Sequence, residues 1–76
     1  MKTVIITGVA GYIGSQLAFY LLKKKYLIIG IDDFSNSHIK DISFLKKFKN
    51  FKLYKKNINK IDFKILKKKK LIILFT

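Results

Sequence analysis

The sequence predicts an α/β fold, a doubly wound sheet of four parallel strands with helices between them. Two observations support this prediction. Four short apolar runs alternate along the 76 residues with longer segments of helical periodicity. Three of these runs are continuously apolar, as strands covered on both faces require. Parallel strands joined by right-handed helical crossovers satisfy both observations in one small domain.

The expected strands are Thr3–Thr7, Leu27–Ile31, Phe51–Tyr54 and Leu71–Phe75. The first helix is expected from Tyr12 to Lys25, because apolar side chains recur every four positions and lysines lie near its negative end. The recurring positions are Ile13, Leu17 and Leu21, and Gly14, Ala18 and Leu22 lie beside them.

A second helix is expected after Ser37, which is a plausible N-cap, with an end near Asn50. Its inward side would carry Ile39, Ile42, Leu45 and Phe48. A third helix would be capped by Asn59, with Asp62 in its first turn and the lysine run 67–70 at its end.

The net charge of +13 comes entirely from lysine, since the chain contains no arginine. A strongly basic chain is typical of proteins that bind nucleic acid or an anionic surface. Nucleic-acid sites more often use arginine, whose planar group grips a phosphate or base edge at two points. The many Lys, Ile, Phe and Asn residues also fit drift towards AT-rich codons. We therefore interpret the lysines as solvated surface, with polyanion binding as the alternative.

Cysteine is absent and His38 is the single histidine, which excludes disulfides and leaves no expected metal site. No apolar run approaches the roughly 18 residues that can span a bilayer. We expect a soluble, cytoplasmic protein without a membrane partner.

The stretch TGVAGYIG, residues 7–14, places Gly8, Gly11 and Gly14 between the first strand and the first helix. A helix start offers unpaired N–H groups and the positive end of the helix dipole, which together can hold a pyrophosphate. Glycines permit the tight turn, the close approach of phosphate and the close packing of helix on strand. A triphosphatase P-loop is excluded, because no Gly-Lys-Ser/Thr follows the glycines.

Asp32 follows the second strand, 18 positions after Gly14, close to the spacing at which a carboxylate meets the ribose of a dinucleotide. Such a carboxylate accepts hydrogen bonds from the ribose hydroxyls and repels a 2′-phosphate, which favours NAD over NADP. Alternatively, Asp32 and Asp33 only end the strand in a polar turn. Together with the glycines, the carboxylate favours an NAD site.

The motif T-G-x-x-G-Y-I-G at residues 7–14, followed by D-D-F-S-N-S at residues 32–37, resembles extended short-chain dehydrogenase/reductases. These are the NAD-dependent sugar epimerases and dehydratases. Among them, the residues of the two motifs are most similar to those of the UDP-glucose 4-epimerases. The resemblance runs from Met1 to Thr76 and covers only the amino-terminal part of such an enzyme. It implies a partial, truncated Rossmann fold of four parallel strands in the order 3-2-1-4.

The resemblance also implies roles for individual residues in NAD binding. The turn and the helix start would hold the pyrophosphate through Gly8, Gly11, Tyr12, Ile13 and Gly14. Asp32 would hold the adenosine ribose, and the adenosine pocket would be lined by Asp33, Phe34, Ser35, Asn36 and Ser37. The family has G-D-I after its third strand, where this chain has Lys56, Asn57 and Ile58. Asn57 would thus offer an amide oxygen to adenine, and Phe75 would line the cofactor site.

In this family the chemistry belongs to a Ser/Thr and a Tyr-x-x-x-Lys pair beyond the fourth strand, with the tyrosine as acid/base. The one literal match here, Tyr20 to Lys24, lies in the expected first helix, far from any nicotinamide, so we expect no catalytic residue. The substrate-binding domain is also absent, and a nucleotide sugar is expected only in an intact enzyme. Because strands suited to burial would stay exposed, residues 1–76 should need a complementary carboxyl-terminal segment or a second copy.

Three functions therefore stay open. The first is an NAD-binding fragment of a UDP-sugar 4-epimerase-like enzyme that is inactive alone. The second is the same portion of a nucleotide-sugar dehydratase or another extended reductase, since the distinguishing residues would lie downstream. The third is a non-enzymatic basic module that binds RNA or an anionic surface, with an affinity that falls steeply with salt.

Overall fold

The computed structural model of the chain describes residues 2–57 and the backbone of residues 71–75. The described elements are β1 (Thr3–Thr7), α1 (Tyr12–Lys23), β2 (Leu27–Asp32), the 3-10 helix η1 (Ile39–Leu45), β3 (Phe51–Lys55) and β4 (Leu71–Phe75). The strand pairs are parallel, which confirms the predicted α/β fold with a parallel sheet. The expected third helix lies outside the described residues. Neither described helix is long and apolar enough to cross a membrane.

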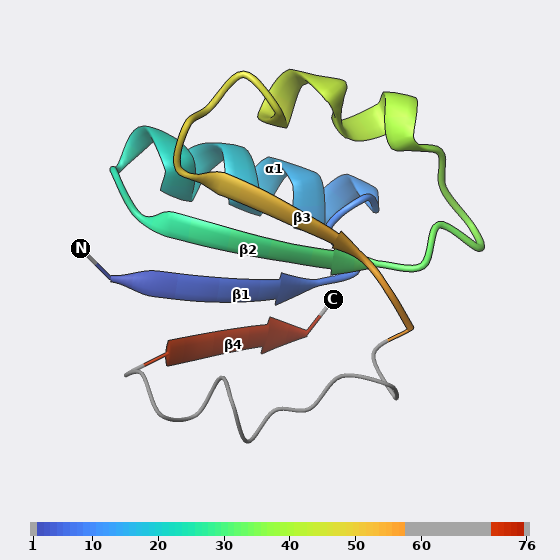
Figure 1. The fold of residues 1–76 in the computed structure, drawn as a ribbon, viewed down its shortest axis with the longest axis horizontal. Helices are drawn as coiled ribbons and strands as arrows, with labels where there is room; N and C mark the ends of the chain where they lie inside the picture. The colour runs from blue at the N-terminus through green and yellow to red at the C-terminus, as the bar shows by residue number, and fades with distance from the viewer. Residues whose placement is uncertain (1, 58–70, 76) are drawn as a thin grey trace.

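The strands lie in the order β3-β2-β1-β4, and all four arrows point towards the same edge of the sheet (Figure 1). In this register Thr7 of β1 lies opposite Ile31 of β2 and Phe75 of β4. Asp32, the last residue of β2, lies opposite Lys55. The carboxyl ends of the strands therefore meet at one edge, which is where open α/β sheets bind their ligands.

Strand β1 is buried on both of its faces. The consecutive residues Val4, Ile5, Ile6 and Thr7 are all buried, as the continuous apolar pattern predicts for a central parallel strand. Strand β3 is different, because its residues alternate between half-buried and exposed. This alternation fits its place at the edge of the sheet, where one face remains solvated.

Helix α1 and η1 pack against each other and share one hydrophobic cluster with the sheet. The buried members of this cluster are Val4, Ile6, Val9, Ala10, Ala18, Leu22, Ile28, Ile42 and Leu45. At its border, the ring of Phe19 in α1 meets Phe44 and Phe48 edge-on, with centroids 5.7 and 5.8 Å apart. Edge-to-face pairs of this kind add about 0.5–1.5 kcal/mol beyond the burial of area.

Helix α1 turns inward the part of the predicted stripe that contains Gly14, Ala18 and Leu22, rather than the part with Ile13, Leu17 and Leu21. The buried positions are Gly14, Ser15, Ala18 and Leu22, whereas Ile13 is 70% exposed. The predicted positions at 17 and 21 are only half-buried and flank the stripe. Small residues at three of the four buried positions suit a helix that lies close to the sheet.

The second helix was predicted correctly for two inward side chains, Ile42 and Leu45, but the predicted helix type, start and end are wrong, because the helix ends at Leu45 and not near Asn50. It is a 3-10 helix that begins after His38, one residue later than the Ser37 cap predicts, and it is kinked at Ile42 (φ −119°, ψ 16°). Ile42 and Leu45 are buried, but Ile39 is 45% exposed. Apolar residues spaced by three match the 3.0-residue period of a 3-10 helix better than the 3.6-residue period of an α-helix. The Asp41 carboxylate also accepts a hydrogen bond from the His38 N–H at 3.0 Å.

Helix α1 ends at Lys23, earlier than predicted, in a left-handed turn centred on Lys25 (φ 72°). The Lys25 N–H donates to the Leu22 carbonyl at 3.1 Å, and the Tyr26 N–H donates to the Leu21 carbonyl at 3.2 Å. These two bonds form a Schellman motif, which usually has glycine at the left-handed position. Lysine at this position carries a backbone penalty that glycine would avoid.

Asn50, which the sequence placed near the end of the second helix, instead fastens the end of α1 to the start of β3. Its side-chain amide donates to the carbonyl of Leu22 at 3.2 Å and to the carbonyl of Tyr26 at 2.6 Å. One side chain thus satisfies two carbonyls at the turn between α1 and β2.

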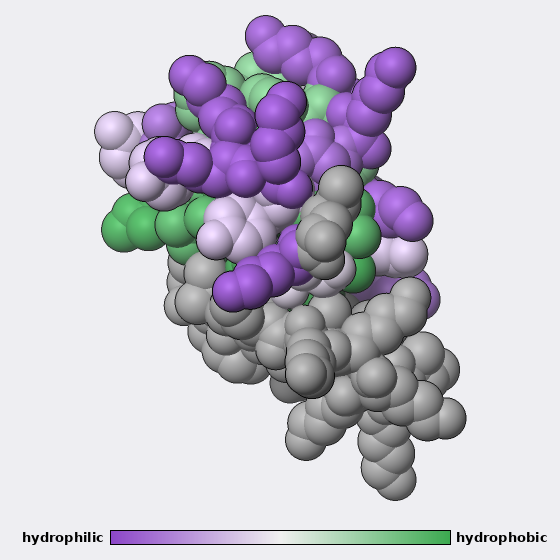
Figure 2. All heavy atoms as spheres, turned by 90° about the vertical axis from the view of Figure 1, so that its left-hand side faces the viewer, coloured by the Kyte–Doolittle hydropathy of each residue, from purple (hydrophilic) through white to green (hydrophobic). Residues whose placement is uncertain are grey.

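The end of the molecule at which α1 finishes is rich in lysine. Lys23, Lys24 and Lys25 are exposed there, and Figure 2, which faces this end, shows hydrophilic side chains gathered over the upper part of the surface. Asp32, the last residue of β2, and Asp33 lie at the opposite end. Lys55 lies opposite Asp32 in β3, so lysines occur at both ends of the sheet.

Strand β2 contains Gly30, at a position where any side chain would clash with a neighbouring residue. A Cβ atom on Gly30 would lie 2.9 and 3.0 Å from the two γ-carbons of Val9 and 3.0 Å from Cε1 of Phe51. Val9 is fully buried and belongs to the turn that follows β1. The missing side chain at position 30 therefore lets this turn pack directly on β2.

Lys25→Gly should raise the free energy of unfolding by about 0.5–1 kcal/mol, because glycine adopts the left-handed conformation without the penalty that lysine incurs. Urea denaturation of the 76-residue chain measures the change. Lys24→Gly is the matched control, since the φ of −85° at Lys24 gives glycine nothing to relieve and its added freedom should lower stability. Equal losses in both variants would contradict the assignment.

Gly30→Ala should lower the free energy of unfolding by about 1–3 kcal/mol, because the new methyl group overpacks the contact with Val9. In a double-mutant cycle with Val9→Ala, the second substitution removes the two γ-carbons, so the combined loss should be smaller than the sum. Strictly additive losses would show that the clash lies elsewhere.

Candidate functional site

The turn after β1 is built on a glycine in the left-handed region. Gly8 has a φ of 67°, and its N–H donates to the Ile31 carbonyl of β2 at 2.8 Å. The N–H of Gly11 then closes the turn on the Gly8 carbonyl at 3.0 Å. Glycine adopts such a conformation without the steric penalty of a Cβ atom, and the turn therefore leaves β1 while still attached to β2.

Gly11 places the start of α1 close to this turn. A Cβ atom on Gly11 would lie 3.3 Å from the Gly8 carbonyl oxygen, so a side chain would push the two apart. Gly11 is the N-cap of α1 and makes no side-chain cap, and the first turn of the helix contains no acidic residue. A helix start without a capping side chain or a carboxylate suits an external anion, which the N–H groups and the dipole attract.

The carboxylate of Asp32 joins the glycine turn to the loop after β2. Its Oδ2 accepts a hydrogen bond from the Ala10 N–H at 2.9 Å, and its Oδ1 accepts one from the Phe34 N–H at 2.8 Å. An ionised carboxylate offers about four lone-pair positions. The two internal hydrogen bonds use two of these positions, and the remaining lone pairs of Asp32 can accept hydrogen bonds from further donors.

The loop after β2 is ordered by a second carboxylate. Oδ1 of Asp33 accepts hydrogen bonds from the backbone N–H of Ser35 at 3.0 Å and from its hydroxyl at 2.9 Å. The backbone N–H and then the hydroxyl of Ser35 hold the pKa of Asp33 below its ordinary value. Within residues 2–57 no three acidic, histidine or cysteine side chains come together as metal ligands.

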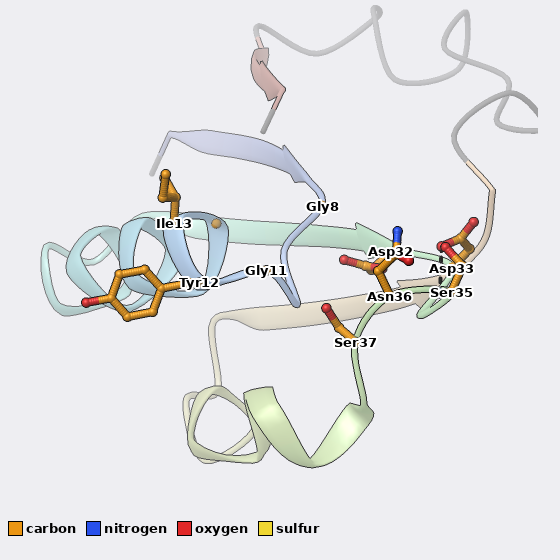
Figure 3. A pocket seen from close by; sticks show the side chains of 10 residues that line it. Gly8, Gly11, Tyr12, Ile13, Asp32, Asp33, Ser35, Asn36 and Ser37 are labelled. Atoms are coloured by element: carbon orange, nitrogen blue, oxygen red, sulfur yellow. Dashed lines mark hydrogen bonds between the residues drawn. The ribbon is translucent and has the colours of Figure 1, made fainter.

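A cavity of about 780 Å³ lies between the glycine turn, the start of α1 and this loop. Figure 3 shows Asp32 and Asn36 on one side, with the side chains of Tyr12 and Ile13 pointing away from them. Helix α1 thus contributes mainly backbone to the cavity. The lining residues are Gly8, Gly11, Tyr12, Ile13, Gly14, Asp32, Asp33, Ser35, Asn36 and Ser37.

Two described residues that the sequence assigned to the site, Phe34 and Asn57, are not among those lining the cavity. Phe34 has a φ of 60° and packs against the hydrophobic cluster instead. Asn57 is exposed beyond the end of β3. Phe75 ends β4 opposite Thr7, next to the turn but without a described side chain, and Ile58 lies outside the described residues.

Sequence reasoning missed Ala10, which contributes the N–H that Asp32 binds. Ala10 is only 4% exposed, and its importance lies in a backbone donor that no residue type reveals. Sequence reasoning also missed the packing role of Gly30. The one indication of this role was the presence of a glycine inside an apolar strand.

The sequence of this chain is similar to those of nucleotide-sugar dehydratases and epimerases. The family model described as GDP-mannose 4,6 dehydratase matches residues 5–73. The dTDP-D-glucose 4,6-dehydratase of Dictyostelium discoideum is 42% identical over 62 residues, which cover 76% of this chain and 14% of that protein. The UDP-glucose 4-epimerase of Schizosaccharomyces pombe is 33% identical over 60 residues, which cover 79% of this chain and 17% of that protein.

A solved structure agrees with these matches. The UDP-Glc/GlcNAc 4-epimerase of Campylobacter jejuni superposes with a TM-score of 0.71 and 29% identity, over 90% of this chain and 20% of that one. The chain thus spans a fifth or less of the length of these relatives. The resemblance in the glycine and aspartate motifs is confirmed: the chain belongs to the GDP-mannose 4,6 dehydratase family, the nucleotide-sugar epimerases and dehydratases among the extended short-chain dehydrogenase/reductases.

Proposed function

We propose that this chain binds the adenosine diphosphate half of NAD, as the amino-terminal part of a UDP-sugar 4-epimerase-like enzyme. The observation that carries the proposal is the cavity between an uncapped helix start and a strand-end carboxylate. The sheet order β3-β2-β1-β4 supports it, since this is the order of the first four strands of a Rossmann sheet, whose dinucleotide lies at the carboxyl ends of the strands.

The pyrophosphate would be held by backbone groups at the start of α1. No side chain caps this helix start, and Tyr12 and Ile13 direct their side chains away from the Asp32 loop (Figure 3). A pyrophosphate can therefore approach the first-turn N–H groups, where the positive end of the dipole stabilises it. Gly11 and Gly8 leave the space that this approach needs, because a side chain on Gly11 would press on the Gly8 carbonyl.

The ribose of the adenosine would be held by Asp32. Two of its lone-pair positions are used by Ala10 and Phe34, which leaves others for the ribose hydroxyls. The same carboxylate would repel the 2′-phosphate of NADP, so NAD is the expected cofactor. Asn36 and Ser37 would border the adenosine. From the family resemblance, Asn57 would contact adenine, Ile58 would follow it in the site, and Phe75 would line the cofactor site.

The chain would hold NAD without using it. In an intact family enzyme, bound NAD accepts a hydride from the sugar and returns it. We propose no catalytic residue among residues 1–76 and assign the nucleotide-sugar substrate to the complete enzyme. A complementary carboxyl-terminal segment or a second copy would cover the remaining sheet. The same geometry would serve a nucleotide-sugar dehydratase, to which this chain is also similar.

The role of the helix start can be tested with Ile13→Asp. A carboxylate at this position should increase the stability of the helix but decrease the affinity for NAD. Ile13 is 70% exposed in the first turn of α1, so a negative charge should stabilise the helix by about 0.3–1 kcal/mol. The same charge should weaken NAD binding about tenfold or more, because it repels the pyrophosphate. Calorimetric titration with NAD and a urea curve measure the two effects.

Gln16→Asp is the matched control for this test. Gln16 is exposed one turn further along α1 and lines a different, smaller cavity. The control adds an equal charge and should change NAD affinity much less. Equal NAD affinities in the wild type and Ile13→Asp, or a wild type that binds no NAD at millimolar concentration, would overturn the proposed function.

A further inference from the structure

The carboxylate of Asp32 connects the two walls of the cavity through separate oxygen atoms. Oδ2 accepts from the N–H of Ala10 in the glycine turn, 22 positions earlier in the chain, and Oδ1 accepts from the N–H of Phe34 in the following loop. Figure 3 shows Asp32 at the end of β2, between the glycine turn and the loop residues. The Asp32 side chain therefore holds the glycine turn and the following loop in fixed positions relative to each other.

The bond to Ala10 is the one that bears on anion binding. Ala10 lies in the turn between Gly8 and Gly11 and is only 4% exposed, so solvent replaces its acceptor poorly. A hydrogen bond from an N–H to a charged oxygen is stronger than one to a neutral oxygen, and a buried donor left without an acceptor is destabilising. The geometry of the turn is therefore coupled to the position of the Asp32 carboxylate.

We propose that Asp32 is a positioning residue for the pyrophosphate part of the site, in addition to any contact with ribose. By holding the Ala10 N–H, it keeps the glycine turn and the start of α1 in the arrangement that accepts an anion. This inference rests on the proposed function, since it concerns how the same cavity is prepared for its ligand. It assigns Asp32 an influence on a group that its own carboxylate does not contact.

Inorganic pyrophosphate separates positioning from direct contact, because it has no ribose. Asp32→Asn removes a negative charge near the cavity, which by electrostatics alone should leave pyrophosphate affinity unchanged or raise it. An asparagine side chain has only one oxygen acceptor, so it can serve Ala10 or Phe34 but not both. We expect pyrophosphate affinity to fall about fivefold or more, which corresponds to about 1 kcal/mol.

Asp41→Asn is the matched control. Asp41 carries the same charge, accepts a hydrogen bond from the His38 N–H rather than from the turn, and is not among the residues that line the cavity. This variant should keep or raise pyrophosphate affinity. If Asp32→Asn behaves like Asp41→Asn, the positioning role is overturned.

Asp32→Glu provides a second variant at constant charge, in case Asp32→Asn unfolds. The added methylene displaces the carboxylate from Ala10 and Phe34, so pyrophosphate affinity should again fall, whereas a role through charge alone predicts no change. Amide hydrogen exchange should show faster exchange of the Ala10 N–H in this variant, with the N–H of Ile5 in β1 unchanged. Unchanged protection of Ala10 would overturn the inference without reference to any ligand.

These measurements also separate this inference from the proposed function. A wild type that binds neither NAD nor pyrophosphate would remove the proposed function and, with it, any positioning role, whatever Ala10 exchange shows. A wild type that binds both, with pyrophosphate affinity unaffected by Asp32→Glu, would retain the function and remove only the positioning role.

Discussion

The parallel pairing of β1 with β2 determines where every part of the site can lie. Because Thr7 is opposite Ile31, the chain leaves β1 beside the last residues of β2, and the Gly8 N–H reaches the Ile31 carbonyl. The next residue of β2 is Asp32, which therefore lies within reach of the turn. A one-residue slip would move every side chain of β1 to the opposite face and would carry the turn away from the carboxylate.

This pairing also explains why glycine is required at unrelated places. Gly8 supplies a left-handed turn, Gly11 a close approach to the Gly8 carbonyl, and Gly30 space for Val9. At Gly8 and Gly30 the missing side chain lets the turn lie against β2, and at Gly11 it lets the start of α1 approach the turn. At Lys25, by contrast, the chain carries a side chain in a left-handed position, at the end of the molecule that faces away from the cavity.

The sequence predicted the strands well because buried parallel strands have a strong local signal. The Thr3–Thr7 strand has the predicted bounds, since its continuous apolar run ends at a glycine. The exposure of Ile13 could not be predicted by spacing alone, because the helix rotates to bring Gly14 and Ala18 against the core. The glycine turn and the Asp32 loop could be placed together, whereas the bond from Ala10 to Asp32 could not, since its donor belongs to the backbone.

The cavity has a further property that follows from its lining residues alone. All of them lie between positions 8 and 37, on two segments joined by one helix and one strand. Closing so short a stretch costs little chain entropy, and contacts of low sequence separation form early in folding. During synthesis, β1, α1 and β2 leave the ribosome before β3 and β4, so every residue that lines the cavity is made before these two strands.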